Sequence, residues 1–187
     1  MKQINIPNIL TVLRILLTPL FVIFLQRGLF SFALLVFIVA AVSDGLDGLL
    51  ARYFKQHTVL GAYLDPIADK LLLASAFVSL SLLKFIPGWL TIIVLSRDIL
   101  ILFAIAVFTI TDTAIEMKPS LPSKFTTVAQ LSTIFFVLLN THFPSIIIFK
   151  PFLFWITASL TILSGFHYIY FGLNVLQEGT GNKPETK

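Results

Sequence analysis

Two short acidic patches carry most of the chemistry that this sequence could perform. Asp44 and Asp47 are three residues apart and Asp65 and Asp69 are four apart, so on two helices each pair would project from one face. Each patch adjoins a long apolar run, where an uncompensated carboxylate is costly and usually functional. Four facing carboxylates stay ionised only if cations lie among them. The spacing therefore predicts a site for hard divalent ions such as Mg2+ or Mn2+.

The face beside Asp44 carries almost no side-chain bulk. Gly48 and Ala51 follow it at i+4 and i+7, which would let a flat group approach the backbone closely. Arg52 comes next and offers a fixed fork of donors to a phosphate. The alternative reading of the two small residues is ordinary helix packing in a membrane.

These residues belong to a longer pattern. The chain contains D-G-L-D-G-L-L-A-R, then eight residues, then G-A-Y-L-D-P-I-A-D. This resembles the signature of the CDP-alcohol phosphotransferase family, D-x2-D-G-x2-A-R-x8-G-x3-D-x3-D, with a match at every fixed position. The opening N-I-P-N-I-L-T-V-L-R is similar to that of the family's phosphatidylglycerophosphate and cardiolipin synthases, so the resemblance covers most of the chain.

The resemblance implies a role for each acidic residue. Asp44 and Asp65 would bridge two divalent ions, Asp47 would complete one site, and Asp69 would complete the other. Asp69 would also take the proton from the acceptor hydroxyl, whose oxygen attacks the lipid-bearing phosphate of CDP-diacylglycerol and expels CMP. A homodimer is implied as well. The residues that the resemblance assigns to CDP-diacylglycerol are Asn8, Thr11, Gly48, Ala51, Arg52, Thr58 and Gly61.

The composition is that of a membrane protein. Of the 187 residues 57% are hydrophobic and 12% charged, and the mean hydropathy is +0.97, far outside the range of a soluble domain. The absence of cysteine excludes disulfides, zinc-thiolate sites and iron-sulfur clusters. The net charge of +4 is spread singly between apolar runs, which favours anionic lipid headgroups over nucleic acid as its counterpart.

Six apolar segments are long enough to span a bilayer. We predict an all-α integral membrane bundle of six transmembrane helices, with the metal site at their cytoplasmic ends. Residues 1–176 would form the membrane domain, and residues 177–187 a polar tail. The first segment is not expected to be a cleaved signal peptide, because Arg14 interrupts its apolar core. The segments are Ile6 to Gln26, Phe30 to Phe54, Gly61 to Leu83, Trp89 to Thr111, Phe125 to Thr141 and Ile146 to Leu173.

The basic residues of the loops predict the orientation. With six spans both termini share a side, and that side carries more lysine and arginine than the other, which places the termini and the acidic patches in the cytoplasm. The predicted location is the bacterial inner membrane. The segment Asp112 to Lys124 is too polar to sit in lipid and is expected to lie across the cytoplasmic surface.

The acceptor alcohol is specified less directly. Arg97 and Asp98 lie inside the fourth span, where they form either a mutual structural pair or a site in which Arg97 binds acceptor phosphate. Lys124 is assigned to the acceptor by the resemblance. Phosphatidylglycerophosphate synthases usually show G-K-x-K-T and Arg-Glu here, whereas this chain has S-K-F-T-T, with Thr126 at the second lysine, and S-R-D, as in the cardiolipin synthases. Glycerol 3-phosphate is the preferred acceptor, and phosphatidylglycerol is the alternative.

The remaining polar residues receive simpler interpretations. Arg14 is expected to extend to the lipid headgroups, with a turn toward the acidic site as the alternative, and Lys70 is also expected to reach headgroups. The three histidines share no metal spacing and are interpreted as structural.

Two other classes of protein place acidic residues in membranes. Ion and proton transporters do so near the bilayer midplane, whereas here the acids lie at one end of two spans and no paired broken helices are visible. Prenyltransferases with Asp-rich motifs resemble longer chains with two similar loops, whereas both patches here fall within one 26-residue stretch.

Overall fold

The computed structural model describes residues 6–54, 59–110, 121–141 and 149–181, and it describes side chains for 11–45, 68–103, 122–141 and 149–170. Within these residues the chain forms six α-helices and no strand, which confirms the all-α prediction. The helices are α1 (Ile6–Gln26), α2 (Phe30–Phe54), α3 (Val59–Leu82), α4 (Gly88–Ile110), α5 (Leu121–Leu139) and α6 (Lys150–Gly181).

Two helices extend well beyond the expected segments, and the other helix ends lie within four residues of their predicted positions. α5 begins at Leu121, so the last residues of the predicted surface segment 112–124 are helical, and Pro122 occupies the first turn, where its missing N–H costs nothing. α6 continues to Gly181, into the predicted polar tail, because a helix that leaves an apolar environment can continue in water. The domain boundary at residue 176 stays a prediction.

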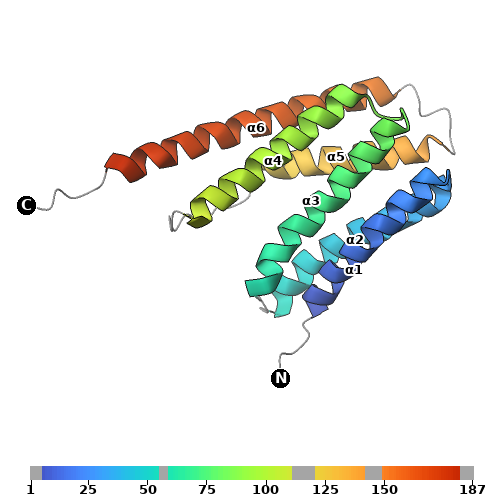
Figure 1. Ribbon diagram of the computed structural model, residues 1–187, viewed down its shortest axis with the longest axis horizontal. Coiled ribbons are helices and arrows are strands. Elements are labelled where there is room, and N and C mark those ends of the chain that lie inside the picture. Colours follow the sequence, from blue (N-terminus) through green and yellow to red (C-terminus); the bar gives the residue numbers. More distant parts are fainter. Residues whose placement is uncertain (1–5, 55–58, 111–120, 142–148, 182–187) are drawn as a thin grey trace, which may run out of the picture.

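The helices form two groups of three (Figure 1). α1 packs against both α2 and α3, while α6 packs against both α4 and α5. Contacts of α3 with α4 and α5, and of α2 with α5, join the groups. Figure 1 shows that the groups diverge toward the N-terminal ends of α1, α3 and α5. The acidic residues of α2 and α3 lie toward this divergent end.

At the end of the bundle opposite to the divergent end, the chain reverses direction in two tight turns. Gly28 has a φ of +71° and donates to Leu25 O, while Leu29 donates to Phe24 O, the Schellman pattern that terminates a helix. The same pattern ends α3 at Lys84, whose φ is +62°. Glycine adopts this conformation without strain, whereas a lysine adopts it at some cost.

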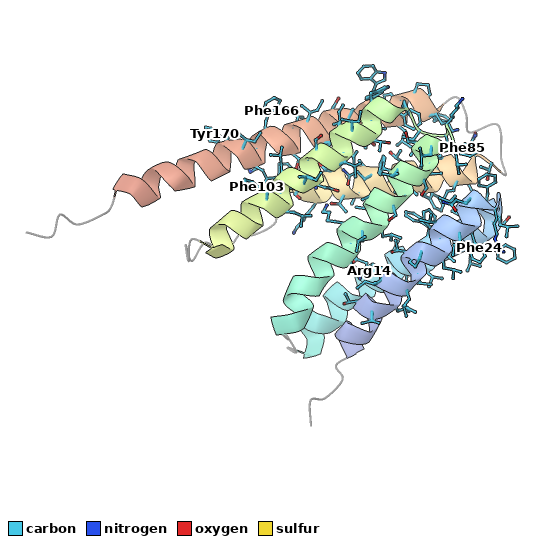
Figure 2. The ribbon with its side chains drawn as sticks, in the orientation of Figure 1. Arg14, Phe24, Phe85, Phe103, Phe166 and Tyr170 are labelled. Carbon is cyan, nitrogen blue, oxygen red and sulfur yellow. The ribbon has the colours of Figure 1, made fainter. Side chains whose placement is uncertain are left out.

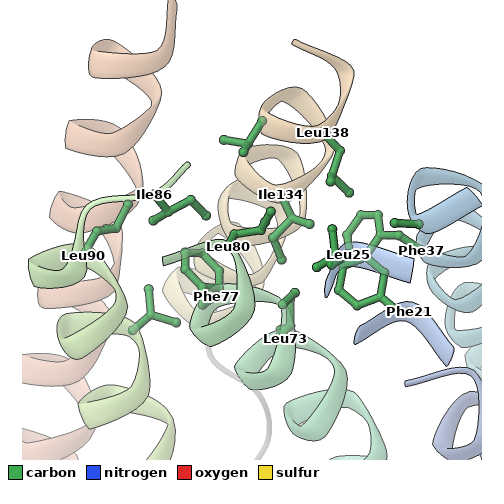
Figure 3. Packing of buried hydrophobic residues seen from close by; sticks show 14 of the residues in the cluster. Phe21, Leu25, Phe37, Leu73, Phe77, Leu80, Ile86, Leu90, Ile134 and Leu138 are labelled. Carbon is green, nitrogen blue, oxygen red and sulfur yellow. The ribbon is translucent and has the colours of Figure 1, made fainter. Parts of the chain in front are cut away.

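The hydrophobic core is centred on the C-terminal half of α3 (Figure 3). Phe77 and Leu80 are fully buried there, with Phe21 of α1 on one side and Ile134 of α5 on another. The rings of Phe21 and Phe37 lie 5.9 Å apart, which joins α1 to α2.

The outer surface is apolar and the interior is partly polar, the reverse of a soluble protein. Phe103, Trp155 and Tyr170 are exposed, whereas Arg14 and Arg97 are buried. Two stretches within the described residues are long and apolar enough to cross a membrane, Pro122–Leu139 and Lys150–Tyr170, and two shorter apolar stretches are Thr11–Gln26 and Phe30–Gly45. Exposed apolar surface of this extent is suited to lipid.

Candidate active site

Arg14 points into the bundle and not toward the headgroups (Figure 2). Its side chain is 1% exposed, and Nη1 lies 2.5 Å from Oδ1 of Asp44 on α2. The expectation that Arg14 extends to the headgroups is therefore wrong, and the alternative turn toward the acidic site is correct. The physical reason is that a carboxylate on the neighbouring helix offers the guanidinium a closer counter-charge than the membrane surface does.

Asp69 of α3 joins this pair. Its carboxylate interacts electrostatically with Lys70, Asp44, Arg14 and Asp98, so acidic residues of the two separate patches do come together. α1 makes this possible because it packs against both α2 and α3. Asp47 and Asp65 lie on the same two helices, so the acidic residues outnumber Arg14 and Lys70, and this surplus of negative charge suits a cation.

The other two predicted metal ligands lie outside the described side chains. Asp47 and Asp65 are on α2 and α3, within about one turn of Asp44 and Asp69 respectively. Among the side chains that the structure describes, no group of three or more potential metal ligands is found. The donor set of the described pair, carboxylate oxygens only, fits Mg2+ or Mn2+.

A second charged cluster joins α3 to α4. Asp98 Oδ1 lies 3.0 Å from Lys70 Nζ and 2.7 Å from Arg97 Nη1, so one carboxylate oxygen serves two cations. The expectation that Lys70 reaches the headgroups is therefore wrong, because its ammonium forms an ion pair with Asp98 on α4. We name these three residues the α3–α4 cluster.

The surroundings of Arg97 explain its burial. Nη2 donates to Ser123 of α5 at 2.7 Å and to Ser164 of α6 at 3.1 Å, and Nε donates to Ser164 at 3.4 Å. The guanidinium also lies 5.8 Å from the ring centre of Tyr168. The expected structural pair of Arg97 and Asp98 is thus present. The hydrogen bonds of Arg97 also join α4 to α5 and α6.

Two residues near the start of α5 differ in their exposure although they are close in the sequence. Lys124 is exposed, whereas Thr126 is fully buried. The hydroxyl of Thr126 lies 2.9 Å from Pro122 O and 3.0 Å from Leu160 O of α6. The side chain of Thr126 therefore faces α6, and its hydroxyl satisfies backbone carbonyls there.

Most of the residues assigned to CDP-diacylglycerol have side chains outside the part of the chain that the structure describes. Thr11 is buried on α1, one turn before Arg14. Of the histidines, His167 is exposed beside Tyr168, and His57 and His142 lie outside the described residues. The side chains that also lie outside the described part are those of Asn8, Ala51, Arg52 and Thr58, together with the glycine positions Gly48 and Gly61.

Buried charge pairs between lipid-facing helices define the class, a helical membrane protein with carboxylates gathered from two helices. The sequence pattern of CDP-alcohol phosphatidyltransferases matches residues 4–163. The chain belongs to this family, whose members are membrane-embedded enzymes of phospholipid synthesis.

Curated relatives fall into two groups. A probable phosphatidylglycerophosphate synthase of Mycobacterium tuberculosis is 43% identical over 101 residues, 51% of this chain and 48% of that protein. The human cardiolipin synthase (CMP-forming) is 32% identical over 190 residues, 92% of this chain and 63% of that protein. A CDP-diacylglycerol--glycerol-3-phosphate 3-phosphatidyltransferase of Pseudomonas fluorescens is 43% identical over 103 residues, 52% of each chain. The chain thus spans about half the length of the two bacterial relatives.

Proposed function

We propose that this protein transfers the phosphatidyl group of CDP-diacylglycerol to the hydroxyl of an acceptor alcohol. The observation that carries the proposal is the approach of Asp44 and Asp69 from two helices, inside a chain of this family. The acceptor oxygen forms a bond to the lipid-bearing phosphorus, and the bond from that phosphorus to the CMP oxygen breaks. Asp69 takes the proton of the acceptor hydroxyl as this bond forms.

The acidic residues would hold two divalent cations, with Asp44 and Asp65 shared between the ions and Asp47 and Asp69 on one ion each. Bound there, Mg2+ or Mn2+ supplies positive charge to the transferring phosphate. The nucleotide half of the donor would lie against Gly48 on α2. The other donor contacts are proposed at Asn8, Thr11, Ala51, Arg52, Thr58 and Gly61.

Glycerol 3-phosphate is the proposed acceptor, with Arg97 and Lys124 on its phosphate. Lys124 is exposed at the start of α5, and Arg97 bonds to Ser123 directly before it, so the two cations belong to one region of the bundle. The product would be phosphatidylglycerophosphate. The second candidate is cardiolipin synthesis from phosphatidylglycerol, which the extended similarity to the human cardiolipin synthase supports.

The wider arrangement is proposed on the same basis. All six helices would span the membrane as one domain over residues 1–176, with the tail after it. The divergent end would face the cytoplasm, where CMP is released. The protein would work as a homodimer in the bacterial inner membrane.

The direct test is an assay of the purified protein with CDP-diacylglycerol, Mg2+ and one acceptor at a time. We expect CMP release and a new lipid with glycerol 3-phosphate, identified by thin-layer chromatography and mass spectrometry. Cardiolipin formed from phosphatidylglycerol, with no reaction of glycerol 3-phosphate, would establish the second candidate in its place. No CMP release with either acceptor, or with other alcohols, would contradict phosphatidyl transfer.

A further inference from the structure

Lys70 is the cation of the α3–α4 cluster that the reaction described above does not use. Its side chain is 16% exposed, so a ligand can reach it, and its ammonium carries three N–H donors. Among the described residues one acceptor is bonded to it, Asp98 Oδ1 at 3.0 Å. Two donors of this partly buried ammonium are therefore left for water or a ligand.

Arg97 is in the opposite situation. Four hydrogen bonds join its guanidinium to Asp98, Ser123 and Ser164, and its side chain is 3% exposed. A guanidinium has five N–H donors, so Arg97 keeps one donor for the acceptor phosphate. Of the two cations in the cluster, Lys70 therefore has more free donors for an anion than Arg97 has.

The unfilled donors and acceptors of the cluster also indicate its ligand. Lys70 and Arg97 contribute two positive charges and Asp98 one negative charge, and the carboxylate of Asp69 interacts electrostatically with both Lys70 and Asp98. Asp98 Oδ2 is buried and, within the described part of the chain, has no hydrogen-bond partner. Unfilled donors beside an unfilled carboxylate oxygen suit a ligand that carries both a phosphate and a hydroxyl group.

We infer that Lys70 binds the phosphate of the acceptor alcohol and that Asp98 is the positioning residue that holds Lys70 beside Arg97. The inference rests on the proposed phosphatidyl transfer. It also accounts for Thr126, where related synthases usually carry a second lysine. Because the Thr126 side chain is buried against α6, the second cation of the acceptor site comes from α3 and not from α5.

The position of Lys70 next to Asp69 suits this role. Neighbouring residues of a helix project about 100° apart, so Asp69 can face Asp44 and Arg14 while Lys70 reaches α4. An acceptor whose phosphate is bound by Lys70 has its hydroxyl close to the general base. Glycerol 3-phosphate and phosphatidylglycerol both combine a phosphate with free hydroxyl groups, and the first carries the larger charge.

The test compares Lys70→Met with Lys70→Arg in the purified enzyme, with CDP-diacylglycerol and Mg2+ and with each of the two acceptors in separate arms. Loss of a charge-assisted hydrogen bond corresponds to an increase in acceptor KM of about 10- to 100-fold for Lys70→Met. We expect kcat and the KM for CDP-diacylglycerol to change less than about twofold, because no donor contact is lost. Lys70→Arg should restore most of the acceptor affinity, since the cation is kept.

Two further variants separate positioning from general damage. Asp98→Asn should raise the acceptor KM, because an uncharged amide holds Lys70 less firmly, and Lys70→Met in the Asp98→Asn background should add little. Lys84→Met is the matched control, an exposed lysine in the turn that follows the other end of α3, and it should leave every constant unchanged. Inorganic phosphate gives an independent readout, since its inhibition constant against the acceptor should rise in Lys70→Met.

Several results would overturn the inference. If the wild-type enzyme is active and the acceptor KM is unchanged in Lys70→Met, the inference about Lys70 is wrong and the proposed function is unaffected. A parallel loss of kcat and of both KM values, or no recovery in Lys70→Arg, would assign Lys70 a structural role. If the wild-type protein releases no CMP with any acceptor, the proposed function falls and the inference falls with it.

Discussion

The α3–α4 cluster predicts an unusual order of stability among its variants. Asp98→Ala removes the shared carboxylate and leaves the cations of Arg97 and Lys70 facing each other in a buried site. Breaking a buried ion pair in this way costs about 3–5 kcal/mol. For a chain of this size that corresponds to a decrease in Tm of about 6 to 20 °C.

The matched variant is Lys70→Met, which should be mild. Its side chain is more exposed than those of its partners, and Asp98 keeps its bond to Arg97. We expect a loss of about 1 kcal/mol or less, a shift of about 2–4 °C. The double variant Asp98→Ala/Lys70→Met should be more stable than Asp98→Ala alone by about 1 kcal/mol or more, because removal of one cation relieves the repulsion.

The assay is thermal unfolding in detergent followed by tryptophan fluorescence. Trp89 and Trp155 are the two tryptophans of the chain, and their rings lie 5.4 Å apart between α4 and α6, so unfolding separates them. A Tm for Asp98→Ala within about 2 °C of the wild type would refute the reasoning. Strict additivity in the double variant would also do so, since independent side chains show no coupling.

The other predictions concern the acidic site and the interior of α5. Asp69→Asn should remove nearly all turnover and leave Tm near that of the wild type, and near-normal CMP release would contradict the assignment of Asp69 as general base. Excess EDTA should abolish activity and Mg2+ or Mn2+ should restore it, whereas full activity in verified absence of metal would exclude a two-ion site. Arg14→Met should lower Tm more in EDTA than in Mg2+, because a cation beside Asp44 replaces the lost guanidinium charge; equal shifts would oppose this. Gln130→Leu should keep or raise Tm, since both amide atoms of Gln130 are buried without a hydrogen-bond partner among the described residues, and a decrease of more than about 3 °C would show that the amide is bonded.

The helices were predictable because their signal is local. Each expected segment is a continuous apolar run, and the first two match α1 and α2 at both ends. The largest extensions fall where polar residues continue a helix, at Leu121 at the start of α5 and at Gly181 after Leu173. Hydropathy detects the part of a helix that meets lipid, and it cannot detect the turns that extend beyond the lipid.

The partners of the charged residues were not predictable in the same way. Arg14 and Asp44 are 30 residues apart and Lys70 and Asp98 are 28 apart, so each pair depends on which helices become neighbours. The sequence did contain a usable signal, since each of these charges interrupts an apolar run, and intramembrane charges pair with one another where they can. The expectation that Arg14 and Lys70 extend to the lipid headgroups was wrong because each side chain has an acidic residue of a neighbouring helix within reach.

The dipeptide Asp69-Lys70 connects the two charged sites of the molecule. Asp69 interacts with Asp44 and Arg14, and Lys70 is bonded to Asp98 of α4. Both residues lie on one rigid helix, so any rotation of α3 would move the proposed general base and the proposed acceptor cation together. The packing of Phe77 and Leu80 in the core of the bundle restrains that rotation. The apolar half of α3 would thereby set the distance between the proposed donor and acceptor sites. A core substitution such as Phe77→Ala should then impair the reaction of both substrates, unlike Lys70→Met, which should affect the acceptor alone.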